Sequence, residues 1–156
     1  MIEIRFAVKE DIEELMRIRL EMLREVNSLP EDASFSEKLV SMSREYFESG
    51  DDATVLAFDG SRAVACASLS FIRIMPTYGH PTGKRAHLMN VYTNPSYRRQ
   101  GLARKMLDML ISLARERGVT EISLDATEAG RPLYESAGFG SNHEAMNLIL
   151  EVPPED

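Results

Sequence analysis

The segment LMNVYTNPSYRRQGLARKML, residues 88–107, joins a strand-like run to a helix through a turn that holds two arginines and a glycine. Helical spacing of apolar residues begins directly after Gly101. The first four N–H groups of a helix lack partners within it and lie at the positive end of its dipole, so they attract anions. A glycine here lets the backbone approach an anion without a Cβ in the way. The segment therefore predicts a strand, an anion-binding turn and a helix in direct succession.

A plainer interpretation of this turn stays open on these residues alone. Gly101 could simply begin the helix, and the neighbouring arginines could form a solvated edge. The Walker loop, GxxxxGK[ST], and the three-glycine dinucleotide fingerprint are both missing from the sequence. The two familiar nucleotide loops are thus excluded, while the anion site and the plain helix start remain alternatives.

The apolar pattern changes between period two and helical spacing, and it predicts the element order β-α-α-β-β-β-α-β-α-β. A capping box from Ser34 to Glu37 would open the second helix. A loop rich in proline and glycine is expected over 75–85. Helices are expected over 9–26, 35–49, 102–118 and 130–137. Strands are expected over 2–6, 54–58, 63–74 (with an irregularity), 86–93, 121–126 and 147–152.

This order predicts a mixed, mainly antiparallel central sheet with helices on both faces, an α/β or α+β fold class. The middle strands form an antiparallel hairpin, whereas the strand–helix–strand units near the C-terminus need crossover connections. A length of 156 residues suits one domain, 1–156, with a short tail at 153–156.

Charge and hydropathy exclude several partners. A formal net charge of −7 argues against binding to nucleic acid or to acidic membranes. No window approaches the roughly 18 apolar residues of a membrane span, and the first residues, charged from Glu3 onward, are unlike a signal peptide. Cys66 is the single cysteine, so no disulfide can form within the chain. We expect a cytoplasmic protein with no metal site.

Two motifs together resemble the GCN5-related N-acetyltransferase (GNAT) superfamily. Residues 98–103, RRQGLA, fit the pattern [RQ]-x-x-G-x-[GA] and follow a strand that ends NVYT. Residues 130–139, GRPLYESAGF, resemble the LYExxGF segment of those enzymes. The resemblance covers nearly the whole chain. It implies the acyl-CoA N-acyltransferase fold and transfer of the acetyl group of acetyl-CoA to an amine.

The resemblance also implies where acetyl-CoA would bind. The backbone edge of Val91, Tyr92 and Thr93 would pair with the pantetheine arm, and one N–H there would polarise the thioester carbonyl. Thr127 occupies a position where the family commonly has an Asn that contacts the CoA arm, so this residue departs from the pattern. The pyrophosphate would be held by the turn and the start of the following helix, namely Arg98, Arg99, Gln100, Gly101, Leu102, Ala103 and Arg104.

Tyr134 is the candidate general acid, because similar enzymes use the tyrosine of this segment to protonate the CoA thiolate. The alternative is an aromatic side chain that only packs between helix and sheet. For the base, the motif strand offers His87, whose ordinary pKa of about 6.5 suits the role, and which could equally be a plain strand histidine. Asn90 cannot act as a base but could orient water or substrate. Glu25 and Glu45 are further candidates.

The resemblance implies that the acceptor enters against residues 22–47 and 75–85, and that it is a small-molecule or peptide amine. A homodimer is an option that the resemblance leaves open. A regulatory module that binds acetyl-CoA without turnover, and a phosphate-binding domain of unrelated function, are the alternatives from other classes. Acyl groups longer than acetyl also stay open.

Overall fold

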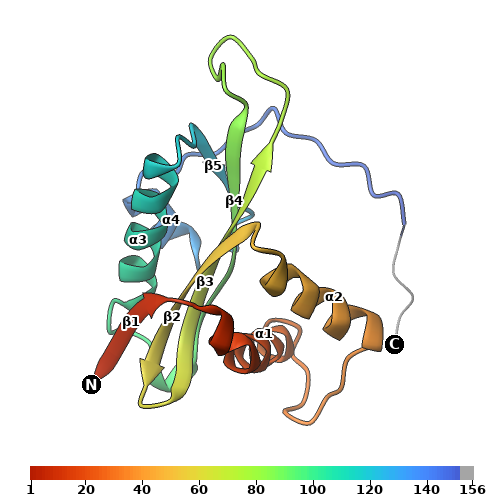
Figure 1. Cartoon of the computed structure of the whole chain (residues 1–156), viewed down its shortest axis with the longest axis vertical. Coiled ribbons are helices and arrows are strands. Elements are labelled where there is room, and N and C mark those ends of the chain that lie inside the picture. Colours follow the sequence, from red (N-terminus) through yellow and green to blue (C-terminus); the bar gives the residue numbers. More distant parts are fainter. Residues whose placement is uncertain (152–156) are drawn as a thin grey trace. The chain divides into compact units, whose positions relative to one another are not determined.

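A computed structural model describes residues 1–151 of the chain. The chain divides into two compact units, Met1–Asp125 and Ala126–Asp156. The first unit holds the whole sheet with its helices α1, α2 and α3, and the second holds the short helix α4 (Figure 1). That residues 1–156 act as one N-acetyltransferase domain stays a prediction.

The first unit contains a five-stranded sheet in the order β1-β2-β3-β4-β5. The first four strands pair with one another antiparallel, and β5 runs parallel to β4. This arrangement confirms the predicted mixed, mainly antiparallel sheet. The strands are β1 (Ile2–Phe6), β2 (Asp52–Asp59), β3 (Arg62–Arg73), β4 (Lys84–Thr93) and β5 (Glu121–Ser123).

Helices cover both faces of this sheet, as the sequence predicts. Helix α1 packs on β3 and β4, and α3 packs on β2, β3 and β4. Side chains alternate between the faces of a strand, so Leu56 and Cys66 meet α1 while their neighbour Val55 faces the other way. The helical segments of this unit are η1 (Lys9–Asp11), α1 (Ile12–Val26), α2 (Glu37–Ser49), η2 (Pro95–Tyr97) and α3 (Leu102–Glu116).

Helix α2 begins later than the predicted capping box. The cap is Ser36, whose backbone is extended and whose hydroxyl accepts a hydrogen bond from the N–H of Leu39 at 3.2 Å. The predicted cap at Ser34 is therefore wrong, because the chain turns into the helix two residues later. Gly50 ends α2 in the left-handed conformation, at φ +82°.

The irregularity expected in the third strand is present. Between Ala57 and Phe58 of β2 the register of β3 shifts from Ala65 to Ala63. A residue of β3 therefore bulges out of the ladder, which increases the local twist of the hairpin.

The second unit contains α4 (Arg131–Ser136) within the predicted short helix. The strand predicted over 147–152 is wrong for residues 147–151, which are not in a strand, and Val152 lies outside the described residues. A strand persists only where a partner takes up its N–H and C=O groups, and alternating apolar residues supply no partner. Leu148, Ile149 and Leu150 accordingly lie 70–90% exposed.

Strand β5 is likewise shorter than expected, with three residues in place of the predicted 121–126. Its pairing with β4 ends at Ser123. Among residues 1–151, no helix has both the length and the apolar character needed to cross a membrane.

The first strand is tied to α1 by one ion pair. Arg5 donates from Nη1 and Nη2 to both carboxylate oxygens of Asp11, at 2.7 and 3.0 Å, and the N–H of Val8 donates to the same carboxylate at 2.7 Å. The guanidinium also stacks 4.4 Å above the ring centre of Phe58. The hydrogen bond from Arg5 lowers the pKa of Asp11 below its ordinary value.

We predict that Asp11→Asn lowers the free energy of unfolding at pH 7, because it removes the ion pair with Arg5. Partial exposure of Arg5 screens that pair, which limits the loss to about 1–2 kcal/mol. A carboxyl with a lowered folded pKa stabilises the fold above its unfolded pKa of about 3.9. The difference in free energy of unfolding between the wild type and Asp11→Asn should therefore shrink as the pH falls below that value. Urea unfolding at pH 7 and pH 3 measures this difference. Glu13→Gln, which breaks an exposed pair with Arg44, is the control and should have a far smaller effect. An equal deficit at both pH values would contradict this role of Asp11.

Candidate active site

Strand β4 leaves its parallel neighbour after a short contact. Only Arg85, Ala86 and His87 pair with β5, opposite Glu121, Ile122 and Ser123. Figure 1 shows β5 beside one end of β4 only. Along 88–93, β4 pairs with β3 on one side and, among the described residues, with no strand on the other. This half of β4 presents a free row of N–H and C=O groups, which another extended chain can pair with.

A bulge at Asn90 lies within this free half. Cys66 of β3 pairs with Tyr92 of β4, and Ser68 pairs with Met89. One residue therefore lies between these pairs on β3, whereas two lie between them on β4. Asn90 takes up the extra residue in the left-handed conformation, at φ +59°, which Asn tolerates better than other side chains. The bulge kinks β4 where its edge becomes free, a position where bulges commonly re-aim a strand.

The side chain of Asn90 is held in place by its neighbours. Its Oδ1 accepts a hydrogen bond from Arg19 Nη1 at 3.1 Å, and its Nδ2 lies 3.4 Å from Ser68 Oγ. Its backbone carbonyl accepts the thiol of Cys66 at 3.1 Å. Asn90 thus fixes the bulge and joins β4 to α1.

Of the predicted edge, Val91 and Thr93 are partly buried and Tyr92 is 6% exposed. Tyr92 belongs to the core cluster beneath α1. Burial raises the pKa of its hydroxyl, and hydrogen bonds to Glu25 and Glu21 raise it further. The Tyr92 side chain is therefore structural, and only its backbone is available at the edge.

The turn after β4 has the geometry expected of an anion site. Arg99 and Gly101 both adopt left-handed backbone angles, at φ +65° and +76°. A Cβ built on Gly101 would meet nothing within 4 Å, so the turn is open on that side. Within the described chain no side chain caps α3, while Leu102 is 4% exposed and anchors its first turn. The N-terminal N–H groups of α3 are thus presented without a side-chain acceptor.

The three predicted arginines differ in their contacts. Arg98 donates to Glu25 Oε1 at 2.5 Å and to the carbonyl of Thr93 at 2.9 Å, so it braces the end of β4 against α1. Arg104 pairs with Asp108 at 3.0 Å. Arg99 and Gln100 are exposed beside the turn, and Ala103 is partly buried.

His87, the other predicted polar residue of β4, lies three residues before the bulge at Asn90. His87 is the last residue to pair with β5, and its Nδ1 lies 2.8 Å from Ser123 Oγ while Nε2 lies 3.7 Å from Asp125. On its other side His87 stands opposite Ser70, whose hydroxyl bonds Tyr46 of α2 at 2.5 Å. His87 therefore faces the α2 side of the sheet at the point where β4 and β5 separate.

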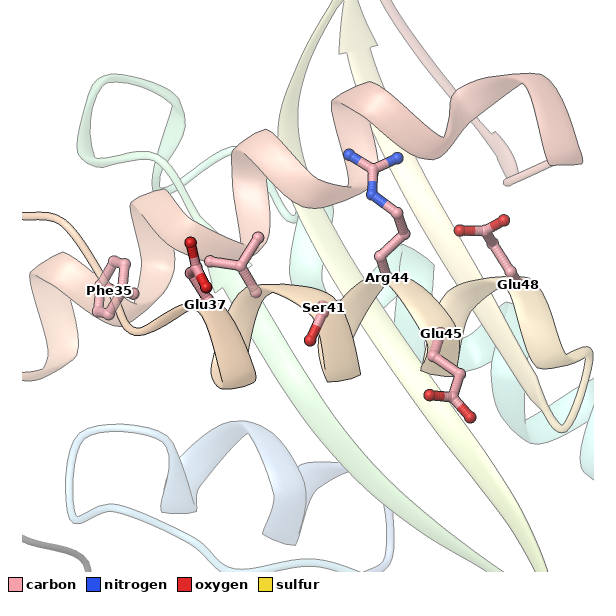
Figure 2. Close-up of a pocket in the computed structure, with 7 residues that line it drawn as sticks. Phe35, Glu37, Ser41, Arg44, Glu45 and Glu48 are labelled. Carbon is pink, nitrogen blue, oxygen red and sulfur yellow. The ribbon is translucent and has the colours of Figure 1, made fainter.

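A hollow on the outer side of α2 is a poor candidate for the site. It has a volume of about 560 Å³ and is lined by Phe35, Glu37, Val40, Ser41, Arg44, Glu45 and Glu48. Figure 2 shows Glu45 pointing away from α1, whereas Arg44 points towards it. All seven residues come from α2 and the loop before it, so the hollow includes no residue of β4 or of the RRQGLA turn. The candidate base Glu45 belongs to this outer surface.

A second cavity, of about 230 Å³, lies between α1, α2 and the bulged part of the sheet. Its lining comprises Arg19, Leu39, Met42, Ser43, Tyr46, Phe47, Ser68, Met89 and Asn90. The expected acceptor region 22–47 thus contributes five of these residues, and the loop 75–85 contributes none. That segment lies against the start of β5 instead: His80 contacts Thr120, the residue before β5, at 2.9 Å, and Arg85 pairs with Glu121 of β5 at 2.5 Å.

Arg19 was not among the residues selected from the sequence. The available signal was a cation on the apolar stripe of α1, four residues after Leu15 and three before Met22, both of which are buried. Such an arginine faces the sheet, where it needs a polar partner.

Tyr134 lies on α4 in the second unit and is partly buried. Burial raises the pKa of its phenol, and among residues 1–151 its hydroxyl has no hydrogen-bonding partner. The ring packs edge-on against Phe139, with centres 6.0 Å apart. A Cβ on Gly130 would come within 3.1 Å of this ring, and Thr127 Oγ1 accepts the N–H of Gly130 at 3.1 Å. The GRPLY turn thus holds Tyr134 as a protonated, unpaired phenol.

A sequence model of the acetyltransferase (GNAT) family matches residues 20–139. The chain belongs to this family. The match spans both units and includes the RRQGLA turn and the LYESAGF segment. The resemblance seen in the sequence is therefore confirmed.

Named relatives agree with the GNAT assignment over part of their lengths. A glucosamine 6-phosphate N-acetyltransferase of Trypanosoma brucei brucei is 33% identical over 89 residues, which are 57% of this chain and 58% of the relative. A [ribosomal protein bS18]-alanine N-acetyltransferase of Escherichia coli strain K12 is 42% identical over 57 residues, 35% of this chain and 38% of the relative. The aligned part thus spans less than two thirds of these curated relatives.

Solved GNAT structures match the fold over almost the whole chain. A predicted acetyltransferase of Clostridium acetobutylicum, solved with acetyl-CoA, superposes with a TM-score of 0.85 at 30% identity, covering 96% of this chain and 97% of that one. A GCN5-related N-acetyltransferase of Ralstonia eutropha JMP134 gives 0.74 at 25% identity, covering 97% and 100%. The predicted acyl-CoA N-acyltransferase fold class is confirmed.

We predict that Gly101→Ala weakens acetyl-CoA binding at least about tenfold, because reorienting the turn removes charge-assisted hydrogen bonds to the pyrophosphate. A left-handed alanine also costs about 1–2 kcal/mol of stability. The matched control is Gly60→Ala in the β2–β3 hairpin, where φ is +63° and a Cβ also meets nothing within 4 Å. It should lose similar stability and keep wild-type affinity, measured by urea unfolding and calorimetry. Wild-type affinity in Gly101→Ala would remove the turn from the cofactor site.

Proposed function

We propose that the protein transfers the acetyl group of acetyl-CoA to a primary amine by direct attack on the thioester. The observation that carries this proposal is the free edge of β4 at 88–93, which leads into the left-handed turn at Gly101 and the uncapped start of α3. A pantetheine arm is an extended chain with amide groups, which suits the strand edge, and a diphosphate is an anion, which suits the turn and the helix start. Family membership and the acetyl-CoA in the Clostridium structure support it.

In the proposed reaction the neutral amine nitrogen attacks the carbonyl carbon of the thioester. Negative charge develops on the carbonyl oxygen, where a backbone N–H of the Val91–Thr93 edge stabilises it. The carbon–sulfur bond then breaks, and the CoA thiolate takes the phenolic proton of Tyr134. The amine proton leaves to a base, and the products are an amide and CoA thiol.

For the pyrophosphate, we propose the N–H groups of Gln100 to Ala103, with Arg99 as an exposed cation beside the turn. Arg98 and Arg104 already have carboxylate partners in Glu25 and Asp108. These two arginines therefore contribute positive charge that is partly neutralised before the cofactor arrives. Thr127 stays a candidate contact of the CoA arm.

For the base, His87 is the better candidate of the two polar residues on β4. Its Nδ1 lies 2.8 Å from Ser123 Oγ and its Nε2 lies 3.7 Å from Asp125, so both ring nitrogens have polar neighbours where β4 and β5 separate. Asn90 has no titratable group, so its proposed role is to orient the substrate or a water. Glu25 is bound to Arg98 and is the weaker alternative.

The acceptor is a primary amine of a small molecule or a peptide. The named relatives act on both kinds, glucosamine 6-phosphate in one and the alanine of a ribosomal protein in another. A cytoplasmic location and a homodimer stay predictions.

Calorimetry with acetyl-CoA, followed by a panel of amines assayed for release of CoA thiol, tests the proposed function. We expect saturable binding and amine-dependent thiol release. Failure to bind at millimolar acetyl-CoA would contradict the proposal, and binding without release for any amine would favour the regulatory module.

We predict that Tyr134→Phe lowers kcat by about 10²–10⁴-fold, the usual effect of losing a general acid. Acetyl-CoA affinity should stay unchanged, because the ring and its contact with Phe139 remain. Tyr97→Phe, which removes a hydroxyl bonded to Asp59 at 2.5 Å, is the matched control and should keep the wild-type rate. A normal kcat in Tyr134→Phe would leave the ring as a packing residue only.

A further inference from the structure

The cavity of about 230 Å³ beside the β4 bulge has one charged group in a mostly apolar wall. Its apolar lining comes from Leu39, Met42 and Phe47 of α2 and from Met89 of β4. Asn90 forms part of the lining, and the next residue, Val91, begins the edge proposed for the thioester. A molecule in this cavity would therefore lie on the acceptor side of that edge.

The charged group is Arg19, which has no carboxylate partner in the described part of the chain, residues 1–151. Among the described residues its guanidinium forms no ion pair, and its one hydrogen bond runs from Nη1 to Asn90. Arg17 on the same helix, by contrast, pairs with both Glu14 and Glu21. The chain has 25 acidic residues and a net charge of −7, so the missing partner does not reflect a shortage of carboxylates.

The groups around Arg19 do not neutralise it. Burial lowers the pKa of the guanidinium, and the opposing effects come from Cys66 and Tyr46. Burial raises the pKa of Cys66 to about 12 and also raises the pKa of Tyr46, so both groups are uncharged near pH 7. An arginine stays protonated even here. The cavity thus carries one uncompensated positive charge in surroundings where an unpaired charge is costly.

The other polar groups of the cavity are already satisfied within the protein. The hydroxyl of Ser43 donates to the carbonyl of Leu39 at 2.7 Å, and Ser68 Oγ bonds Thr54 at 2.7 Å. Tyr46 bonds Ser70. Only the guanidinium has several donors left for a ligand, and its planar fork matches a carboxylate in a bidentate pair. A sugar phosphate would need polar partners for its hydroxyls, which these walls do not supply.

We propose that this cavity binds the acceptor as an amine that bears one carboxylate and an apolar side chain, with Arg19 pairing with the carboxylate. The apolar side chain packs against Met42, Phe47 and Met89, and the amine reaches the thioester at the β4 edge. The ligand class is that of an apolar amino acid. This inference rests on the proposed acetyl transfer and gives it a substrate class.

The test compares amines that differ only in the carboxylate, with the full chain and acetyl-CoA. The pairs are L-leucine with isopentylamine and L-phenylalanine with phenethylamine. We expect kcat/KM about 10- to 100-fold higher for the amino acid, mainly through KM, because a charge-assisted pair is lost with the plain amine. Arg19→Gln should abolish that preference and Arg19→Lys should keep part of it. Equal values for both members of each pair, or a preference that survives in Arg19→Gln, would overturn the inference.

Two controls separate recognition from folding. Arg44→Gln removes an arginine of α2 that pairs with Glu13 and lines the outer hollow, so it should keep the preference. Met42 is 54% exposed, so both Met42→Glu and Met42→Gln should fold. Met42→Glu should repel the carboxylate and lose the preference, whereas Met42→Gln should keep the preference. If Arg44→Gln loses the preference, or if Met42→Glu keeps it, the result would count against Arg19 as the determinant.

A binding arm keeps the inference apart from the proposed function. Hydrocinnamate, a carboxylate without an amine, is titrated into the wild type and Arg19→Gln by calorimetry. Binding that weakens at least about tenfold in Arg19→Gln supports the inference even if no amine is acetylated, whereas equal or undetectable binding overturns it. Glucosamine 6-phosphate with glucosamine forms a further pair. An Arg19-dependent preference confined to that pair would overturn the assignment of a carboxylate in favour of a phosphate.

Discussion

The separation of β4 from β5 after His87 is the constraint on which the rest of the site depends. While two strands stay paired, their N–H and C=O groups satisfy each other and no ligand can bind between them. Here pairing stops after three residue pairs, and the extra residue at Asn90 bends β4 at the start of its free half. The proposed cofactor edge exists because β5 ends at Ser123.

The same bulge connects the two sides of the proposed reaction. The backbone of Asn90 leads into the Val91–Thr93 edge. Its side-chain oxygen accepts a hydrogen bond from the guanidinium of Arg19 in the cavity under α2. A change in the bulge should therefore affect both acetyl-CoA and the acceptor. Positioning by one bulge suits acetyl transfer, because the amine and the thioester must meet within a narrow range of distance and angle.

Much of the fold was predictable because apolar periodicity records which face of each element is buried. The apolar runs around Leu56 and Cys66 identified the inner strands, and the spacing after Gly101 identified α3. The strand over 147–152 failed in its described part because a local pattern does not reveal whether a partner strand exists. The cap at Ser34 failed because Ser36 offered an equally good oxygen two residues later. Arg19 was missed because its importance comes from having no carboxylate nearby among the described residues, and the sequence does not show which residues surround it.

The sequence by itself determined the GNAT family, the strand–turn–helix that would hold a diphosphate, and Tyr134 as the candidate acid. These features are local, since each needs only a few neighbouring residues with particular backbone and side-chain chemistry. Only the tertiary structure decided that Arg98 is engaged by Glu25 and that, among residues 1–151, β4 has no partner strand on its β5 side after His87 and Arg19 has no carboxylate partner. These facts depend on which distant residues share a space, because pairing, burial and neutralisation of charge are properties of contacts between elements.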